Sequence, residues 1–190
     1  RRHRVVYDRA LAALPPHDVQ RVETDYGEVQ TLTFGGGSGT PVVLLHGLSC
    51  TSAMWRDNVR ALAENRAIVA IDIISDCGGG KQTAPGTSLD DLVRSVSQTL
   101  DGLGIPRAHV VGLSYGAWVG AGLALQDPER LVSLSLLEPA GTLDRIRPAY
   151  VRGLLVSFLR RSARRWRFLF RRRPSDELIA LLDASRGFRP

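Results

Sequence analysis

The feature that most constrains the fold of this chain is residues 110–116, which read Val-Val-Gly-Leu-Ser-Tyr-Gly. An apolar, β-prone run leads into Ser114, and residues 117–125 after it have helical periodicity. Gly112 and Gly116 flank the serine, which gives the G-x-S-x-G pattern of a sharp turn from a strand into a helix. Glycine is needed on both sides because a side chain there would strike the adjoining strand or helix. The pattern predicts a strand that passes directly into a helix.

The same turn has a chemical consequence. It places Ser114 in a backbone region that costs about 1–3 kcal/mol for a non-glycine residue, and it lifts the hydroxyl clear of the sheet. The N-terminus of the next helix then points at this hydroxyl, so the amide of Tyr115 faces any oxyanion that forms there. The alternative is a glycine-flanked serine in an ordinary loop, since the bare pattern is common by chance. Its position between a strand and a helix favours Ser114 as a nucleophile.

The positive charge of the chain is concentrated in one segment. The net charge is +6, but residues 151–173 contain nine arginines and no acidic residue, which leaves −3 for the rest. Proteins that bind nucleic acid usually spread basic residues over the fold, so we expect no nucleic-acid partner. No apolar run reaches transmembrane length and no signal peptide is visible, which predicts a cytoplasmic location. The length of 190 residues suffices for one domain with a substantial core.

Apolar patterns predict that strands and helices alternate from about residue 41 onward. The predicted strands cover residues 17–24, 28–34, 42–45, 67–74, 108–113 and 131–137, and the predicted helices cover residues 4–14, 51–64, 88–103 and 115–126. Several strands are continuous apolar runs, which are typical of strands buried on both faces of a parallel sheet. The alternation therefore predicts an α/β fold with a mostly parallel sheet and flanking helices.

The pattern changes toward the C-terminal end. Residues 148–173 are predicted to form an arginine-rich helix, and residues 175–184 a second helix. The first helix carries an apolar stripe of Leu159, Ala163, Trp166 and Phe170. We therefore divide the chain into a core, residues 1–143, and a helical cap segment, residues 144–190. The stripe is expected to cover the candidate site, and contact of residues 158–173 with an anionic membrane surface is the second interpretation.

The two cysteines indicate no metal site. Cys50 and Cys77 lack the spacing of metal ligands, and they follow strands that are expected to be neighbours at one edge of the sheet. Their positions would allow a disulfide. Two small buried thiols are the expectation for a cytoplasmic protein.

Several motifs occur in a fixed order along the chain. They are His-Gly-Leu-Ser at residues 46–49, Trp55, Asp-Ile-Ile-Ser-Asp at residues 72–76, the turn around Ser114, and residues 127–141. Together they resemble the α/β-hydrolase fold family, and most of all its carboxylesterases. The resemblance implies a serine hydrolase that acts on small carboxylic esters through an acyl-enzyme intermediate, without a metal or organic cofactor. The family's usual G-x-G-x-S after the aspartate is absent, and Asp72 is expected to brace this loop.

The resemblance also implies roles for individual residues. Ser114 would be the nucleophile, and the amides of Tyr115 and Leu48 would form the oxyanion hole. Gly47 would let the backbone turn toward the substrate. His46 ends a strand, and its expected role is to fix the oxyanion loop by hydrogen bonds rather than to act as the base.

The acid of a catalytic triad has one candidate. In this fold the triad residues follow in the order serine, acid, histidine. Glu138 comes directly after the strand that follows the Ser114 turn, and some α/β hydrolases place their acid there. A structural carboxylate that supports the cap is the interpretation we favour, with the triad acid as the alternative.

The base is not found after Ser114. The histidines of the chain are His3, His17, His46 and His109. His109 opens the strand that ends at the serine, and five residues at about 3.3 Å each place it roughly 16 Å away. We therefore expect a C-terminally truncated hydrolase that lacks its catalytic histidine and, on its own, is inactive and prone to associate. The alternative is a non-catalytic or degenerate binding module with the same fold.

Overall fold

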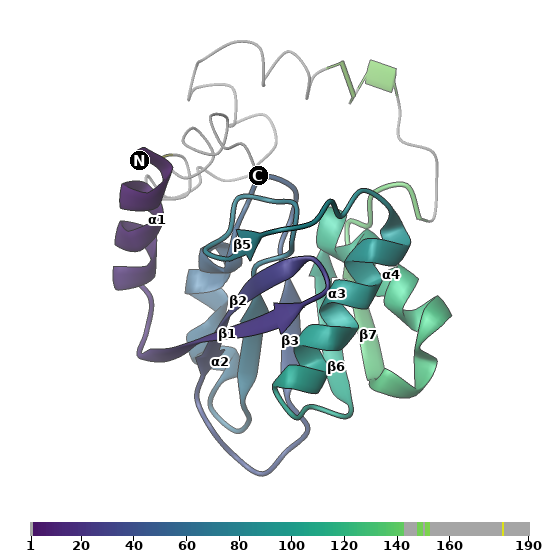
Figure 1. Cartoon of the computed structure of the whole chain (residues 1–190). Coiled ribbons are helices and arrows are strands. Elements are labelled where there is room, and N and C mark those ends of the chain that lie inside the picture. The colour runs from purple at the N-terminus through teal and green to yellow at the C-terminus, as the bar shows by residue number, and fades with distance from the viewer. Residues whose placement is uncertain (1, 143–147, 150, 153–179, 181–190) are drawn as a thin grey trace.

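The computed structural model describes residues 2–142, 148–149, 151–152 and 180, and within them shows a seven-stranded sheet flanked by helices (Figure 1). The strands are β1 (His17–Thr24), β2 (Gly27–Phe34), β3 (Val42–Leu45), β4 (Ile68–Ile71), β5 (Lys81–Gln82), β6 (Ala108–Leu113) and β7 (Leu131–Leu137). Their order is β1-β2-β4-β3-β6-β7, and β5 pairs with β2. The strands β4, β3, β6 and β7 are parallel, whereas β1, β2 and β5 join through antiparallel pairs. The predicted mostly parallel α/β sheet is confirmed.

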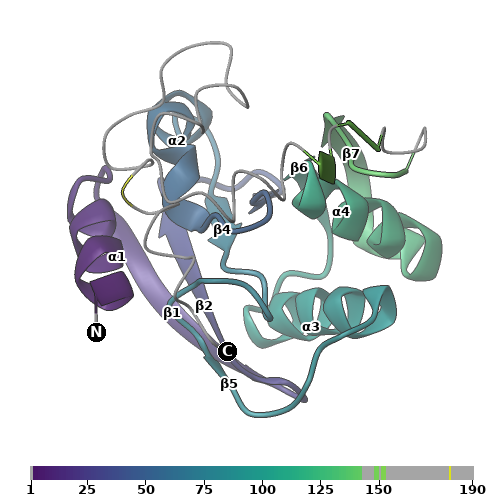
Figure 2. The ribbon, with the colours of Figure 1, turned by 90° about the horizontal axis from the view of Figure 1, so that it is seen from above.

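The helices cover the two faces of the sheet (Figure 2). They are α1 (Arg2–Ala12), the short 3-10 helix η1 (Ser52–Trp55), α2 (Arg56–Leu62), α3 (Leu89–Gly102), α4 (Tyr115–Gln126) and the short 3-10 helix η2 (Pro128–Arg130). Helices α3 and α4 pack on one face, and η1, α2 and α1 pack on the other. The core therefore consists of two apolar layers separated by the sheet.

Alternating side chains of the central strands supply both layers. Val43, Leu45, Val69 and Ile71 pack beneath α3 and α4, and Val42, Leu44, Ile68 and Ala70 pack beneath η1 and α2. All eight are buried, because β3 and β4 lie inside the sheet with helices on either side. This arrangement explains why both strands read as continuous apolar runs rather than as alternating patterns.

The predicted elements differ from the structure in several places, besides shifts of one or two residues at the ends of α1, β2 and α3. The helix predicted at residues 51–64 is divided into η1 and α2 and ends at Leu62. The strand predicted at residues 67–74 ends at Ile71, because the amide of Ile73 donates to the ring of His46 at 3.0 Å instead of continuing the sheet. The two-residue strand β5 was not predicted, since a single pair of residues carries no periodic signal.

The predicted cap falls largely outside the described residues. This applies to the helices at residues 148–173 and 175–184, to the stripe Leu159, Ala163, Trp166 and Phe170, and to the surface of residues 158–173. The division into residues 1–143 and 144–190 therefore stays a prediction. Among the residues that are described, no helix combines the length and the apolar character needed to cross a membrane.

Two leucines on α4 give matched tests of the packing. Leu123 is 0% exposed and Leu125 is 84% exposed. We expect Leu123→Ala to lower the free energy of unfolding by about 2–5 kcal/mol, because it removes buried methyl groups and leaves a cavity. Leu125→Ala should change it by less than about 0.5 kcal/mol. Urea unfolding followed by circular dichroism measures both, and equal losses would contradict the position of α4.

Candidate active site

The carboxyl ends of β3 and β6 lie side by side at the point in the sheet where the strand order reverses: β4 follows β3 on one side, and β6 is then added on the other side of β3. The chain leaves β3 through η1 and α2 on one face to reach β4, whereas α3 carries it across the other face from β4 to β6 (Figures 1 and 2). Leu45 and Gly112 are register partners near the two strand ends. The loops that follow therefore leave in opposite directions, and α/β proteins bind ligands at this position.

Ser114 stands where β6 passes into α4, with φ 52° and ψ −106°. Such a backbone costs about 1–3 kcal/mol for a non-glycine residue and persists only where the surroundings hold it. The amide of Ser114 donates to the carbonyl of Leu137 at 2.9 Å, and its carbonyl accepts from the amides of Trp118 at 3.0 Å and Ala140 at 3.3 Å. The end of β7 and the first turn of α4 therefore hold the strained turn from two sides, and the predicted strand–turn–helix is confirmed.

The two glycines beside Ser114 are required by backbone contact. A Cβ atom on Gly112 would collide with the carbonyl oxygen of Gly116, and a Cβ atom on Gly116 would collide with that of Leu45. The first turn of α4 thus lies directly against the end of β3. This close approach brings Ser114 next to the loop that follows β3.

That loop is a tight turn at residues 47–50. A Cβ atom on Gly47 would lie 4.0 Å from the Cβ atom of Ser114. The amide of Cys50 donates to the carbonyl of Gly47 at 3.0 Å, and Ser49 has a φ of 61°. A four-residue turn with this bond and a positive φ at its third residue alone is a type II turn. Leu48, the second residue of the turn, is 50% exposed.

Two hydrogen bonds to one oxygen set the direction of the Leu48 amide. The carbonyl of Gly47 accepts from the amide of Cys50 and from Nδ1 of His46 at 2.9 Å. Nε2 of His46 accepts from the amide of Ile73 at 3.0 Å, so Nδ1 carries the ring proton. Because a trans peptide points its N–H opposite its C=O, the Leu48 amide is directed away from the His46 ring. These bonds support the predicted role of His46 in fixing the loop.

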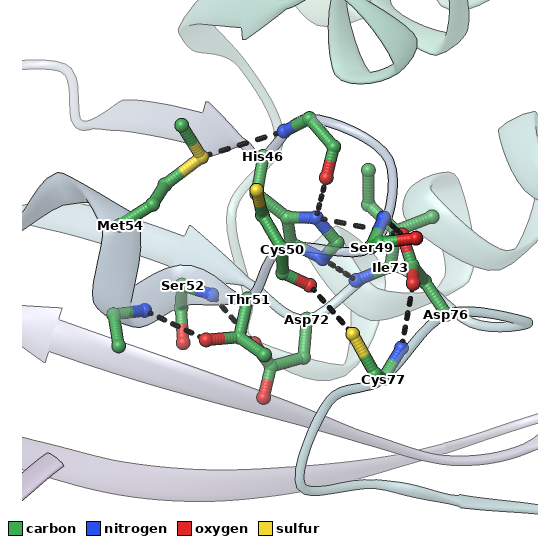
Figure 3. A network of polar contacts seen from close by, with 12 residues as sticks. His46, Ser49, Cys50, Thr51, Ser52, Met54, Asp72, Ile73, Asp76 and Cys77 are labelled. Atoms are coloured by element: carbon green, nitrogen blue, oxygen red, sulfur yellow. Dashed lines mark hydrogen bonds and ion pairs between the residues drawn. The ribbon is translucent and has the colours of Figure 1, made fainter. Parts of the chain in front are cut away.

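The carboxylate of Asp76, from the loop after β4, faces the same turn (Figure 3). It accepts from the amide of Ser49 at 2.7 Å and from the amide of Cys77 at 2.8 Å. It also lies 4.0 Å from Nδ1 of His46, and its side chain is only 7% exposed. Sequence reasoning placed Asp76 in this loop but gave it no role, because its partner is a backbone amide that no sequence pattern marks.

The charge of Asp76 contributes to the raised pKa values of two nearby residues, Cys50 and Tyr115. Burial, and after it the charge of Asp76, raises the pKa of the Cys50 thiol to about 12. The same two causes, in the same order, raise the pKa of the Tyr115 hydroxyl to about 12. The charge of Asp76 therefore acts both on the end of the turn and on the first residue of α4.

A second buried carboxylate, Asp72, joins α1, η1 and the loop after β4 through hydrogen bonds, and Figure 3 shows the bond from Ser52. It accepts from the amides of Ser52 and Gly79 at 2.8 Å each, and from the hydroxyl of Tyr7. The side chain of Gln30 in turn donates to the Tyr7 hydroxyl at 2.7 Å. Burial, followed by the charge of Asp72, raises the pKa of Tyr7 far above its usual value. The prediction that Asp72 braces its loop is confirmed, and α1 and β2 are found to share the same network.

The histidines do not supply an evident base. Both ring nitrogens of His46 are engaged by backbone groups, so it can take a proton from the neighbouring serine only by giving up one of these bonds. His109 lies at the start of β6, at the opposite end of the strand from the serine, and hydrogen bonds with Ser133 at 2.8 Å. His3 belongs to α1 and His17 opens β1.

Backbone strain marks the edge of the sheet at which these loops meet. In the described part of the chain, the non-glycine residues with positive φ are Ser49, Ser75, Ser114 and Glu138. Each follows the carboxyl end of a parallel strand by no more than four residues. Strained backbone of this kind clusters at functional sites. Glu138 itself is exposed and has a φ of 45°, directly after β7.

The cysteines are thiols in this structure. Cys50 and Cys77 are free and buried, and Sγ of Cys77 donates to the carbonyl of Cys50 at 3.4 Å. The expectation of two buried thiols is confirmed. Within the described residues, no three His, Cys, Asp or Glu side chains are grouped so that they could hold a metal ion.

Comparison with known sequences finds one matching family model and individual relatives. A family model described as "Alpha/beta hydrolase family" matches residues 42–189. Carboxylesterase YbfK of Bacillus subtilis (strain 168) is 30% identical over 135 residues, which cover 70% of this chain and 46% of the relative. The dihydrolipoyllysine-residue acetyltransferase component of the acetoin cleaving system of Pseudomonas putida is 34% identical over 138 residues, which cover 73% of this chain and 37% of the relative. The chain therefore spans less than half the length of these relatives.

Solved structures share the fold. The crystal structure of naproxen esterase (carboxylesterase NP) from Bacillus subtilis has a TM-score of 0.91 and 22% identity, and covers 99% of this chain and 67% of its own. The structure of carboxylesterase CesB (YbfK) from the same organism has a TM-score of 0.89 and 23% identity, and covers 100% of this chain and 68% of its own. At these identities the likeness concerns the fold alone.

Two tyrosines give a matched test of the Asp72 network. Tyr7 donates its hydroxyl to buried Asp72, and Tyr26 donates to Asp91 at 2.9 Å in a bond that is only partly buried. We expect Tyr7→Phe to lower the free energy of unfolding by about 1–3 kcal/mol, because it leaves buried polar groups without a partner. Tyr26→Phe should cost less, since water replaces the lost bond. Thermal and urea unfolding compare the two, and a larger loss for Tyr26→Phe would contradict the network.

Proposed function

Because this chain belongs to the alpha/beta hydrolase family, we propose that the complete gene product hydrolyses carboxylic esters with Ser114 as the nucleophile. The observation that carries the proposal is the strained backbone of Ser114, held where β6 meets α4 and beside the turn at residues 47–50. A serine with only a packing role has no need of this backbone, whereas a nucleophile needs its hydroxyl lifted from the sheet. Relatives named carboxylesterases support an ester as the substrate.

The proposed reaction has two halves. Oγ of Ser114 adds to the carbonyl carbon of the ester while its proton passes to a base, and the tetrahedral intermediate then expels the alcohol, which leaves with that proton. Water attacks the resulting acyl-enzyme in the same way and releases the carboxylic acid and the free serine. Neither half needs a metal or an organic cofactor.

The oxyanion hole in this proposal consists of the amides of Tyr115 and Leu48. Tyr115 is the first residue of α4, and the first amides of a helix have no partner within it. Leu48 lies in the turn that approaches Ser114, and its amide is directed by the bonds to Gly47 described above. Donors held in place before the reaction cost no reorganisation when the charge develops, and each contributes about 10²–10³ in kcat.

The substrate is proposed to be a small-molecule ester. We propose that residues 144–190 contribute a cap, which would select the substrate. Glu138 is retained as the candidate acid, because it follows β7 directly and lies two residues before Ala140, whose amide holds the carbonyl of Ser114.

The nucleophile is tested with a serine variant. In the complete gene product, Ser114→Ala should abolish labelling by a fluorophosphonate probe and remove hydrolysis of p-nitrophenyl acetate, because the variant lacks the hydroxyl that forms the acyl-enzyme in the proposed reaction. Ser135→Ala, an exposed serine on the neighbouring strand β7, is the matched control and should leave both unchanged. Labelling that persists in Ser114→Ala would exclude Ser114 as the nucleophile.

The role of Glu138 is tested by removing its charge. If Glu138 is the triad acid, Glu138→Gln should lower kcat by about 10⁴ while the fold stays intact, because the imidazolium formed during the reaction loses its counter-charge. Glu129→Gln, at an exposed glutamate in η2, is the control. A loss of less than about tenfold would leave Glu138 with a structural role.

A further inference from the structure

We infer that Met54 is an oxidation site, where hydrogen peroxide converts the thioether to a sulfoxide and thereby slows the reaction at Ser114. The effect on the rate rests on the proposed function. Met54 lies in η1 and is the single methionine of the 190 residues. Its sulfur accepts from the amide of Gly47 at 3.4 Å, and Figure 3 shows this side chain directed at the backbone beside His46.

The peptide between His46 and Gly47 lies between this sulfur and the first turn of α4. Its N–H points at Met54, and a trans peptide points its C=O the opposite way. A Cβ atom on Gly116 would lie 2.6 Å from the carbonyl oxygen of His46, so no space is left between the two backbones. Gly116 follows Ser114 by two residues. A shift of this peptide on the side of Met54 is therefore transmitted to the turn that carries the serine.

The chain has three sulfur atoms, and the one in Met54 is the most open to a small oxidant. Met54 is partly exposed, whereas Cys50 and Cys77 are buried. Peroxide reacts with the thiolate form of cysteine, and burial, with the charge of Asp76 after it, raises the pKa of the Cys50 thiol to about 12. A thioether needs no deprotonation before it is oxidised. We therefore expect oxidation at Met54 first.

The oxidation is a two-electron step that needs peroxide alone. A lone pair on the sulfur attacks one oxygen of hydrogen peroxide, the O–O bond breaks and a sulfur–oxygen bond forms. The departing hydroxide takes the proton left on the transferred oxygen, and water is released. The sulfur is thereby oxidised to the sulfoxide and the peroxide is reduced. Methionine sulfoxide reductases reverse the change.

The added oxygen changes the contact between Met54 and Gly47. The sulfur already lies at contact distance from the amide, so the oxygen must either enter this contact or take the side chain out of it. An oxygen that enters replaces a weak acceptor with a strong one and draws the amide to a new position. A side chain that leaves takes the acceptor away and opens a gap beside the turn, because Met54 packs on the apolar layer around Trp55.

Either change acts on the rate through the same peptide. Its N–H side shifts with Met54, whereas its C=O side has no free space against Gly116. The backbone of Ser114 is strained and depends on its surroundings to hold it. A misplacement of about 1 Å can cost about 10² in rate, so we expect the smaller shift here to cost about tenfold.

The test exposes the complete gene product to hydrogen peroxide and follows both the modification and the rate. Peptide mass spectrometry should find one added oxygen on Met54, and kcat for p-nitrophenyl acetate should fall about tenfold in proportion to the oxidised fraction, with an unchanged circular dichroism spectrum. Methionine sulfoxide reductases should restore the rate. Met54→Leu has a similar volume and cannot be oxidised, so it should start within about threefold of wild type and keep its own rate after peroxide.

The matched control adds a methionine far from the serine. Leu125 is 84% exposed near the C-terminal end of α4, and Leu125→Met combined with Met54→Leu should take up oxygen without a loss of rate. If Met54→Leu does not fold, the recovery of wild type by the reductases, followed together with the oxidised fraction of Met54, decides the question without a variant.

Two results overturn the inference. One is a protein that carries the sulfoxide at Met54 and keeps its full rate. The other is a Met54 that stays unmodified in the Leu125→Met variant after the introduced methionine is fully oxidised. Hydrolysis by the untreated protein that persists in Ser114→Ala overturns the proposed function instead, and the mass of the Met54 peptide still reports the oxidation independently of that result.

Discussion

The contact between the first turn of α4 and the carboxyl end of β3 is the constraint on which the rest of the site depends. Gly116 lies so close to the carbonyl of Leu45 that no side chain fits between them. This contact fixes where β6 must end and where α4 must begin, and with them the position of Ser114. It also brings the turn after β3 within reach of the serine, since Gly47 follows Leu45 by two residues. A single close packing of backbone on backbone therefore sets the positions of both the proposed nucleophile and the proposed oxyanion loop.

The strain at this edge of the sheet is balanced by hydrogen bonds that reach across neighbouring loops. Ser114 is held by β7 and α4, and Ser49 is held by Asp76 from the loop after β4. Each strained residue costs about 1–3 kcal/mol, which is a considerable part of the 5–15 kcal/mol by which a domain is stable. The rigid apolar layers on the two faces of β3 and β4 make this cost tolerable, because they fix the strand ends from which the loops start. The strained residues thus lie in loops that directly follow rigid, buried strands.

A structural feature could be predicted from the sequence when it is set by residues of one segment, and not when it is set by a contact between distant segments. The bounds of β3, β6, α4 and β7 follow from the apolar periodicity of each segment, and the Ser114 turn follows from the two glycines beside it. The end of β4 at Ile71 could not be predicted, because it is set by a bond from Ile73 to His46, which lies in another loop. The contact of Asp76 with the turn could not be predicted for the same reason. An aspartate in a loop is ordinary, and this contact depends on the orientation of the Ser49 peptide in another loop. No pattern of residue types encodes the orientation of a peptide in a distant loop.

The proposed nucleophile and oxyanion hole differ from the catalytic base in what fixes their positions. The described residues place Ser114, the proposed nucleophile, beside the turn that carries a proposed oxyanion amide, and the register of β3 with β6 fixes their relative position. A base has different requirements, since an imidazole needs only to reach the serine hydroxyl and to be held there by an acid. His46 cannot act as this base while its Nε2 accepts from the amide of Ile73. To take the serine proton it would have to give up this bond, and the loop that it supports would lose a contact. Holding the proposed oxyanion loop and accepting the serine proton are thus competing uses of the same ring, and the hydrogen bonds of His46 favour the first.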